Sequence, residues 1–104
     1  MKTGDLMFWW IPQVPMKPFH YPVQSPEEAA LLYDAFAKYD LFQLEHNVKP
    51  DYCNAGGLLV WEEDVEPNAR GEKWIDWHFE DNANYIDMDF EEWVYQVFMK
   101  GRDR

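Results

Sequence analysis

The sequence is poor in cysteine, in basic residues and in long apolar runs. Cys53 is the only cysteine among 104 residues, so no disulfide can form within the chain, and a reducing compartment is favoured. Lys and Arg number 9 against 20 Asp and Glu, which gives a net charge of −11. Phosphate binding needs Lys and Arg, so this charge argues against DNA or RNA as a direct ligand. The same sign argument excludes an anionic membrane surface.

Apolar residues are plentiful, but they do not gather into a long run. The run nearest the start, Leu6–Ile11, is too short for the core of a signal peptide or for a membrane span. We therefore expect a cytoplasmic protein. Aromatic residues make up 18% of the chain, whereas disordered acidic chains are poor in aromatics. The length suits a single folded domain over residues 1–104, with a frayed tail from residue 101.

The first half of the chain predicts a strand, a connector, a helix and a second strand. Leu6–Ile11 is typical of a buried strand, and the four prolines that follow indicate a stiff connector or the edge of a sheet. Ser25 is a natural N-cap for a helix over Pro26–Tyr39, with Glu28 completing a capping box. Apolar and polar residues then alternate over Leu41–Val48, which predicts a strand.

The second half predicts a hairpin and a final helix. Residues 49–57 indicate a loop in which Asn54 and the pair Gly56 and Gly57 supply the turn geometry. The next two strands, Leu58–Glu63 and Lys73–Glu80, form a hairpin with a longer loop.

A polar turn follows over residues 81–89. The last helix begins at the N-cap Asp89, with Glu92 three residues on, and ends before Gly101. This order of elements predicts an α+β fold: a mainly antiparallel sheet of three to four strands with two helices packed on one face.

Negative charge is concentrated in the second half of the chain. Residues Glu62–Glu92 hold twelve carboxylates against only Arg70 and Lys73, and tryptophans are interspersed among them. Aromatic anchors ringed by acids suit a protein interface that faces a basic partner, such as a nucleic-acid-binding protein. The candidate partner-binding residues are Glu62, Glu63, Asp64, Glu66, Trp74, Asp76, Trp77, Glu80, Asp81, Asp87 and Glu91. There are two alternatives: the acidic surface serves solubility alone, or exposed aromatic residues mediate a homodimer.

Catalytic and metal-binding patterns are weak. Cys53 lies in a plausible loop, so a small enzyme or ligand-binding module that uses Asp51–Gly57 is the alternative function. Nothing in the sequence spacing brings a histidine to this thiol, however. His78 and Glu80 share a strand face that a cation could use, yet the acidic stretch lacks the pattern of a calcium loop. We expect a protein that is not an enzyme, with no catalytic residues, no metal and no cofactor.

Three stretches carry a resemblance to known proteins: "FWWIPQVPMKPF", "SPEEAALLYDAFAKYDLFQ" and "KPDYCNAGGLLVWEED". Over roughly residues 8–64 the chain resembles small accessory proteins encoded by bacteriophages and prophages. The resemblance implies the cytoplasm of an infected bacterium and a host-directed inhibitor, of an anti-restriction or anti-CRISPR kind that imitates DNA. It assigns no functional residues. Acidic DNA mimics are often largely helical, whereas this chain mixes helices and strands.

Overall fold

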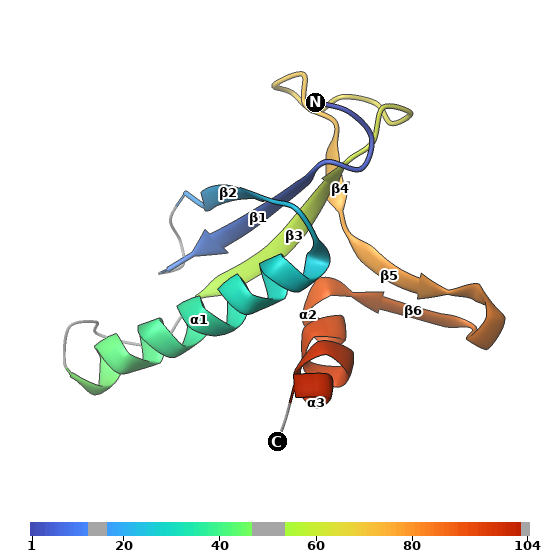
Figure 1. Cartoon of the computed structure of the whole chain (residues 1–104). Coiled ribbons are helices and arrows are strands. Elements are labelled where there is room, and N and C mark those ends of the chain that lie inside the picture. Colours follow the sequence, from blue (N-terminus) through green and yellow to red (C-terminus); the bar gives the residue numbers. More distant parts are fainter. Residues whose placement is uncertain (13–16, 47–53, 103–104) are drawn as a thin grey trace.

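A computed structural model of the chain describes residues 1–12, 17–46 and 54–102 (Figure 1). The strands are β1 (Leu6–Ile11), β2 (Phe19–Val23), β3 (Ala55–Trp61), β4 (Trp74–Asp76), β5 (His78–Asp81) and β6 (Ile86–Asp89). The helices are α1 (Pro26–Glu45), the 3-10 turn η1 (Asn82–Asn84), α2 (Phe90–Trp93), the π-helical η2 (Val94–Phe98) and α3 (Met99–Arg102). The described part contains two sheets, the long helix α1, a short 3-10 turn and a C-terminal helical segment made of α2, η2 and α3 in succession.

The main sheet has four strands in the order β2-β1-β3-β4, and each neighbouring pair is antiparallel. The predicted hairpin of β3 and β4 is confirmed. The proline-rich segment had two interpretations, a stiff connector or the edge of a sheet, and its described part β2 forms one edge of the sheet. Pro22 is tolerated there because an edge strand does not need every backbone donor. The predicted α+β fold with a mainly antiparallel sheet is confirmed.

Both helical segments cover the same face of the main sheet. Phe8 and Leu58 point from the sheet into the core and are almost completely buried. Full burial of a side chain such as Phe8 stabilises the fold by about 1.5–3 kcal/mol. The core as a whole consists of Phe8, Trp10, Val23, Ala29, Ala30, Tyr33, Leu58, Phe90, Trp93 and Val94.

Helix α1 extends beyond its predicted end at Tyr39, and the strand predicted over Leu41–Val48 is wrong for every residue that the structure describes there. Asp40 explains the error. Its carboxylate is buried and accepts hydrogen bonds from the indole Nε1 of Trp10 at 3.2 Å and from Asn54 Nδ2 at 3.0 Å. Asp40 therefore belongs to the buried stripe of the helix, although it is charged and lies just beyond the predicted end.

The strand predicted over Lys73–Glu80 is divided at Trp77. Up to Asp76 the chain pairs with β3, and the N–H of Trp77 still donates to the carbonyl of Leu58 at 3.0 Å. The Trp77 ring then packs edge-on against Phe90 and Trp93, with ring centroids 6.1 and 5.3 Å away. This packing leads the following strand β5 away from the main sheet.

Strand β5 pairs with β6 in a separate two-stranded sheet, so the predicted polar turn over residues 81–89 contains a strand. We call β5, η1 and β6 together the arm. It projects from the body of the molecule in Figure 1. The Cα radius of gyration is 15.2 Å, compared with about 13 Å for a compact chain of this length. The arm gives the molecule an extended outline.

The predicted start of the last helix is confirmed. The side chain of Asp89 accepts a hydrogen bond from the N–H of Glu92 at 2.8 Å, and the Glu92 side chain bonds back to Asp89. The predicted end is wrong, because α3 includes Gly101 and Arg102. Of the helices in the described residues, none has the length and apolar character that a membrane crossing would need.

Candidate functional site

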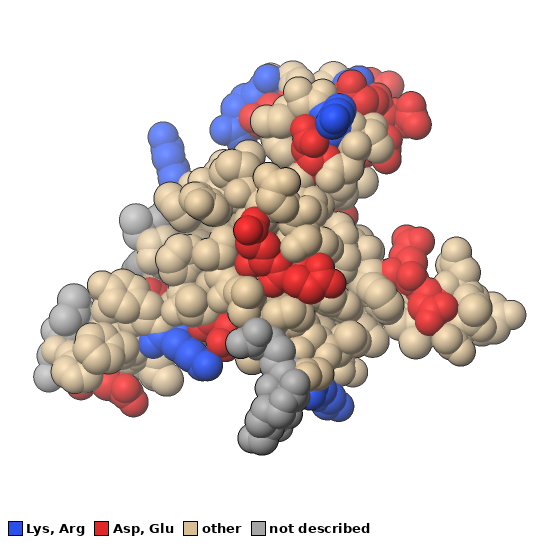
Figure 2. Space-filling model, viewed as in Figure 1, with Lys and Arg blue, Asp and Glu red and all other residues tan. Residues whose placement is uncertain are grey.

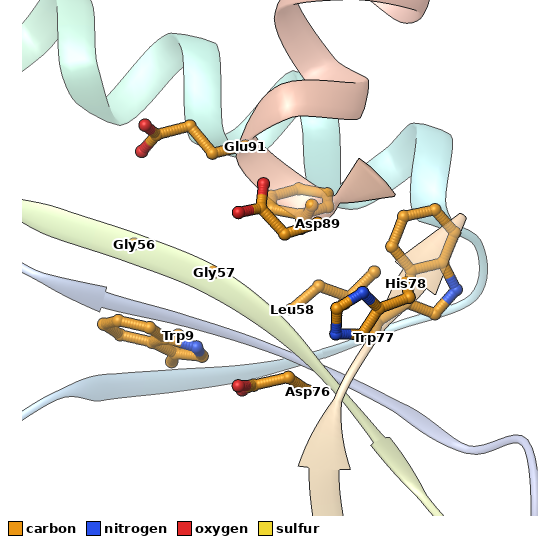
Figure 3. A pocket seen from close by; sticks show the side chains of 10 residues that line it. Trp9, Gly56, Gly57, Leu58, Asp76, Trp77, His78, Asp89 and Glu91 are labelled. Carbon is orange, nitrogen blue, oxygen red and sulfur yellow. The ribbon is translucent and has the colours of Figure 1, made fainter. Parts of the chain in front are cut away.

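A groove of about 380 Å³ lies where the arm leaves the main sheet (Figure 3). Strand β3 forms its floor, the β1 residue Trp9 and the β4 residue Asp76 form one wall, and the start of α2 forms the other. The lining residues are Trp9, Gly56, Gly57, Leu58, Asp76, Trp77, His78, Asp89, Phe90 and Glu91.

The floor of the groove is a strand edge that is open in the described structure. Hydrogen bonds alternate between the two sides of an antiparallel strand. The bond from Trp61 N to Asp5 O shows that odd-numbered residues of β3 bond to β1. The bond from Trp77 N to Leu58 O shows that even-numbered residues face β4. The N–H and C=O of Gly56 therefore point past the end of β4, where no described strand pairs with them.

Gly56 and Gly57 are strand residues, so the predicted turn at this pair is wrong, and neither has a positive φ. Close packing of aromatic rings explains the two glycines. A Cβ on Gly57 would lie 2.6 Å from the indole nitrogen of Trp9, and one on Gly56 would collide with the ring of Trp10. The two rings thus cover opposite faces of β3, and only Trp9 faces the groove.

Three carboxylates, Asp76, Asp89 and Glu91, line the groove, and we call them the groove carboxylates. Figure 3 shows Asp76 on one side of β3 and the other two on the opposite side. Glu91 is held by the hydroxyl of Tyr33, which donates to its Oε2 at 2.6 Å. Burial and this hydrogen bond raise the pKa of Tyr33 above its ordinary value, so the hydroxyl keeps its proton and remains a donor.

The arm continues the acidic lining. The register places His78 opposite Asp89 and Glu80 opposite Asp87, which puts these four side chains on one face. His78 Nδ1 lies 3.2 Å from Asp87 Oδ1. The opposite face carries Phe79 and Met88, which pack against the core. The register also puts Asp81 on this inner face, at the end of the arm, where its Oδ2 accepts a hydrogen bond from Asn84 Nδ2 at 2.8 Å. The outer face of the arm is therefore acidic, and the inner face is mainly apolar.

Four more of the predicted acids lie elsewhere, on the connection between β3 and β4. We call Glu62, Glu63, Asp64 and Glu66 the loop carboxylates. Thr3 donates to Glu62 Oε1 at 3.4 Å, and Trp61 Nε1 donates to Glu63 Oε1 at 2.6 Å. Basic side chains lie close by: Lys73 Nζ donates to the Glu63 carbonyl at 2.8 Å, and Arg70 lies 3.5 Å from Glu72. Figure 2 shows red and blue side chains mixed at this end of the molecule.

The two predicted tryptophan anchors are both partly buried. Trp77 lines the groove but packs chiefly into the core, as described above. Trp74 packs edge-on against Trp61, with ring centroids 5.2 Å apart. Trp9 was not among the predicted site residues, although it is the aromatic wall of the groove. The sequence did offer a signal for this wall: the pair Trp9-Trp10 in one strand and the pair Gly56-Gly57 in another.

The alternative site on Asp51–Gly57 is only partly visible. Asp51, Tyr52 and Cys53 lie outside the described residues. The side chain of Asn54 donates a hydrogen bond to the buried carboxylate of Asp40, and the glycines belong to β3. Within residues 1–12, 17–46 and 54–102, no three His, Cys, Asp or Glu side chains are arranged to hold a metal ion.

Comparison with known proteins gives two matches. The model of a family described as superinfection exclusion gene product 17 matches residues 5–98. A superinfection exclusion protein of Salmonella phage P22 is 44% identical over 97 residues, which cover 84% of this chain and 94% of that protein. No solved structure matches. The resemblance to small phage accessory proteins is confirmed.

Proposed function

This chain belongs to the superinfection exclusion gene product 17 family, and on that premise we propose that it is a non-enzymatic acidic inhibitor that occupies a basic protein surface. It acts in the cytoplasm of the infected bacterium. The partner is a protein of the host or of the superinfecting phage whose basic surface serves nucleic-acid binding, as in restriction or CRISPR machinery. The acidic surface competes there with the phosphate backbone.

One observation supports this proposal: in the described part of the chain, His78 is the one basic side chain at ion-pair distance from the carboxylates of the groove and of the outer face of the arm. Among the described residues, no Lys or Arg forms an ion pair with Asp76, Glu80, Asp87, Asp89 or Glu91. The side chains of Asp76 and Glu80 are exposed. Carboxylates that share a surface without Lys or Arg partners raise the local negative potential, which speeds the encounter with a basic partner.

Capture from lysates of phage-infected bacteria at two salt concentrations tests the proposal. The bait is the chain itself, compared with two variants that lose the same charge. Asp76→Asn with Glu80→Gln neutralises the acidic surface at the groove and arm, and Asp64→Asn with Glu66→Gln neutralises the loop. We expect a captured protein that is lost at high salt and is lost with the first variant only. Salt screens the interaction between exposed charges that are more than about 10 Å apart at 0.1 M ionic strength and more than about 3 Å apart at 1 M.

Two outcomes would overturn the proposal. Capture that is equally strong at both salt concentrations would show that charge does not drive docking. Capture that is lost equally with both variants would show that net charge, rather than the surface at the groove and arm, is what the partner recognises.

A further inference from the structure

We propose that the groove binds an extended, Lys- or Arg-bearing segment of the partner protein by adding it as a further strand to the open edge of β3. This inference rests on the proposed function, because it specifies how the basic partner is held. It assigns a backbone contact in addition to the charge contact.

The open edge supplies the hydrogen bonds for such an added strand. Gly56 directs both its N–H and its C=O into the groove, beyond the last pairing of β3 with the Trp77 backbone. An unpaired strand edge is a ready template for another chain, and proteins normally cover or distort it. Here β4 and the Trp77 backbone cover the edge only from Leu58 to Trp61, because the chain turns away after Trp77.

The glycines permit the close approach that strand pairing requires. Neighbouring strands lie about 4.8 Å apart, so side chains that crowd the edge would hinder an incoming backbone. Gly56 and Gly57 carry no side chains of their own, and the rings of Trp10 and Trp9 lie over their two faces instead. Glycine inside a strand often marks a place where another backbone comes near.

The two walls select the side chains of the incoming segment. Successive side chains of a strand point to opposite faces of the sheet. One side chain would therefore meet Asp76 and the ring of Trp9, and its neighbour would meet Asp89 and Glu91 (Figure 3). Both positions favour a cation, and a Lys or Arg over the Trp9 ring gains a cation–π contact as well. A pair of adjacent basic residues fits both walls.

A second copy of this chain is a poor occupant of the edge. Two copies would each bring a net charge of −11 to the contact, and they would place the groove carboxylates against one another. Like charges that meet at an interface cost several kcal/mol. The charge of the groove therefore favours a basic segment of another protein.

Amide hydrogen exchange of the ¹⁵N-labelled protein tests the proposal, with a synthetic octapeptide of repeating Val-Lys-Arg as the probe. Gly57 is the internal control, because its N–H faces β1 and is paired in the free protein. We expect the Gly56 amide to exchange rapidly in the free protein and at least 10-fold more slowly with the peptide. Gly57 should change little.

A matched peptide with N-methyl groups on alternate amides keeps the charge but cannot pair along one edge. Two such peptides are made, one methylated on the odd-numbered amides and one on the even-numbered amides. We expect each to bind at least 10-fold more weakly than the unmodified peptide. If the methylated and unmodified peptides bind equally, with no protection of Gly56, the strand addition is wrong, while the acidic docking surface remains supported. If neither peptide binds, the strand addition is also wrong.

A concentration series of the free protein completes the test. Protection of Gly56 that rises with protein concentration, together with a dimer mass, would show that the edge pairs with a second copy and would overturn the proposal. The proposed function is judged separately, by capture of the partner with the charge-matched variants.

Discussion

The loop carboxylates and the groove carboxylates carry the same kind of charge in different settings. Around the loop, Lys73 and Arg70 lie among the acids, and the oxygens of Glu62 and Glu63 accept hydrogen bonds from Thr3 and Trp61. Around the groove, the described residues provide no Lys or Arg partner. Acids of both sets accept hydrogen bonds within the chain, since Asp89 caps α2 and Glu91 accepts from Tyr33. The difference lies in the basic side chains: the loop acids lie beside Lys73 and Arg70, whereas the groove acids have no Lys or Arg partner among the described residues. The number of acids in a stretch of sequence does not distinguish these two settings.

The largest expected effect separates the tryptophans of the two regions. Trp77→Ala should lower the free energy of unfolding by about 3 kcal/mol, because the ring packs against Phe90 and Trp93 in the core. Trp74→Ala should cost about 1 kcal/mol, since its main partner is the Trp61 ring. Urea denaturation of both variants measures the two values. Equal losses would mean that Trp77 does not anchor the departure of the arm.

A pH titration sharpens the comparison on the groove side. The pKa of Tyr33 is raised in the folded protein, first by burial and then by the bond to Glu91. The unfolded chain loses this proton near pH 10, whereas the folded protein keeps it. The stability is therefore complete below pH 10 and falls above it, by up to about 1.4 kcal/mol per pH unit.

The matched variant for this titration is Tyr33→Phe. It should be less stable at neutral pH by about 1 kcal/mol, because it loses the bond to Glu91. Above pH 10 its free energy of unfolding should fall less steeply with pH than that of the parent, because the variant lacks the one proton that the folded parent retains. Parallel curves in this range would contradict the account of the Tyr33 and Glu91 pair.

The smallest expected effect is a change in the free energy of unfolding when one acid is neutralised, and its sign differs between the arm and the loop. Glu80 lies directly opposite Asp87 in the arm, so two like charges face each other. Glu80→Gln should therefore raise the free energy of unfolding by about 0.5 kcal/mol. Glu63→Gln should lower it by about 0.5 kcal/mol, because Glu63 accepts the Trp61 indole bond. Differential thermal melts measure both, and a loss of stability in Glu80→Gln would contradict the idea of uncompensated charge in the arm.

The sequence was sufficient to predict the strand β1, the hairpin of β3 and β4, the start of both helices and the concentration of acids, because these follow from local patterns. The capping residues Ser25 and Asp89 fulfil the predicted N-cap roles. The capping box predicted at Ser25 is wrong, because the Glu28 side chain accepts from the N–H of Gln24. The end of α1 could not be predicted, because the polar residue Asp40 is buried by bonds to Trp10 and Asn54, which are distant in the sequence.

The groove is a tertiary feature, and the sequence could not predict it. It exists because β4 ends at Asp76, and β4 ends because Trp77 packs against a helix that follows later in the chain. A strand pattern that continues through Trp77 gives no sign of this break. Of the predicted acids, Asp76 and Glu91 lie in the groove, and Glu80, Asp81 and Asp87 lie on the adjoining arm.

The efficiency of plating of a superinfecting phage tests the central claim most directly. Bacteria would express the parent chain, the variant with Asp76→Asn and Glu80→Gln, or the charge-matched variant with Asp64→Asn and Glu66→Gln, at equal protein levels. We expect the first variant to lose exclusion by at least 10-fold and the second to exclude the phage as well as the parent does. Full exclusion by the first variant, or equal loss in both, would contradict the claim that the acidic surface at the groove and arm is what the partner binds.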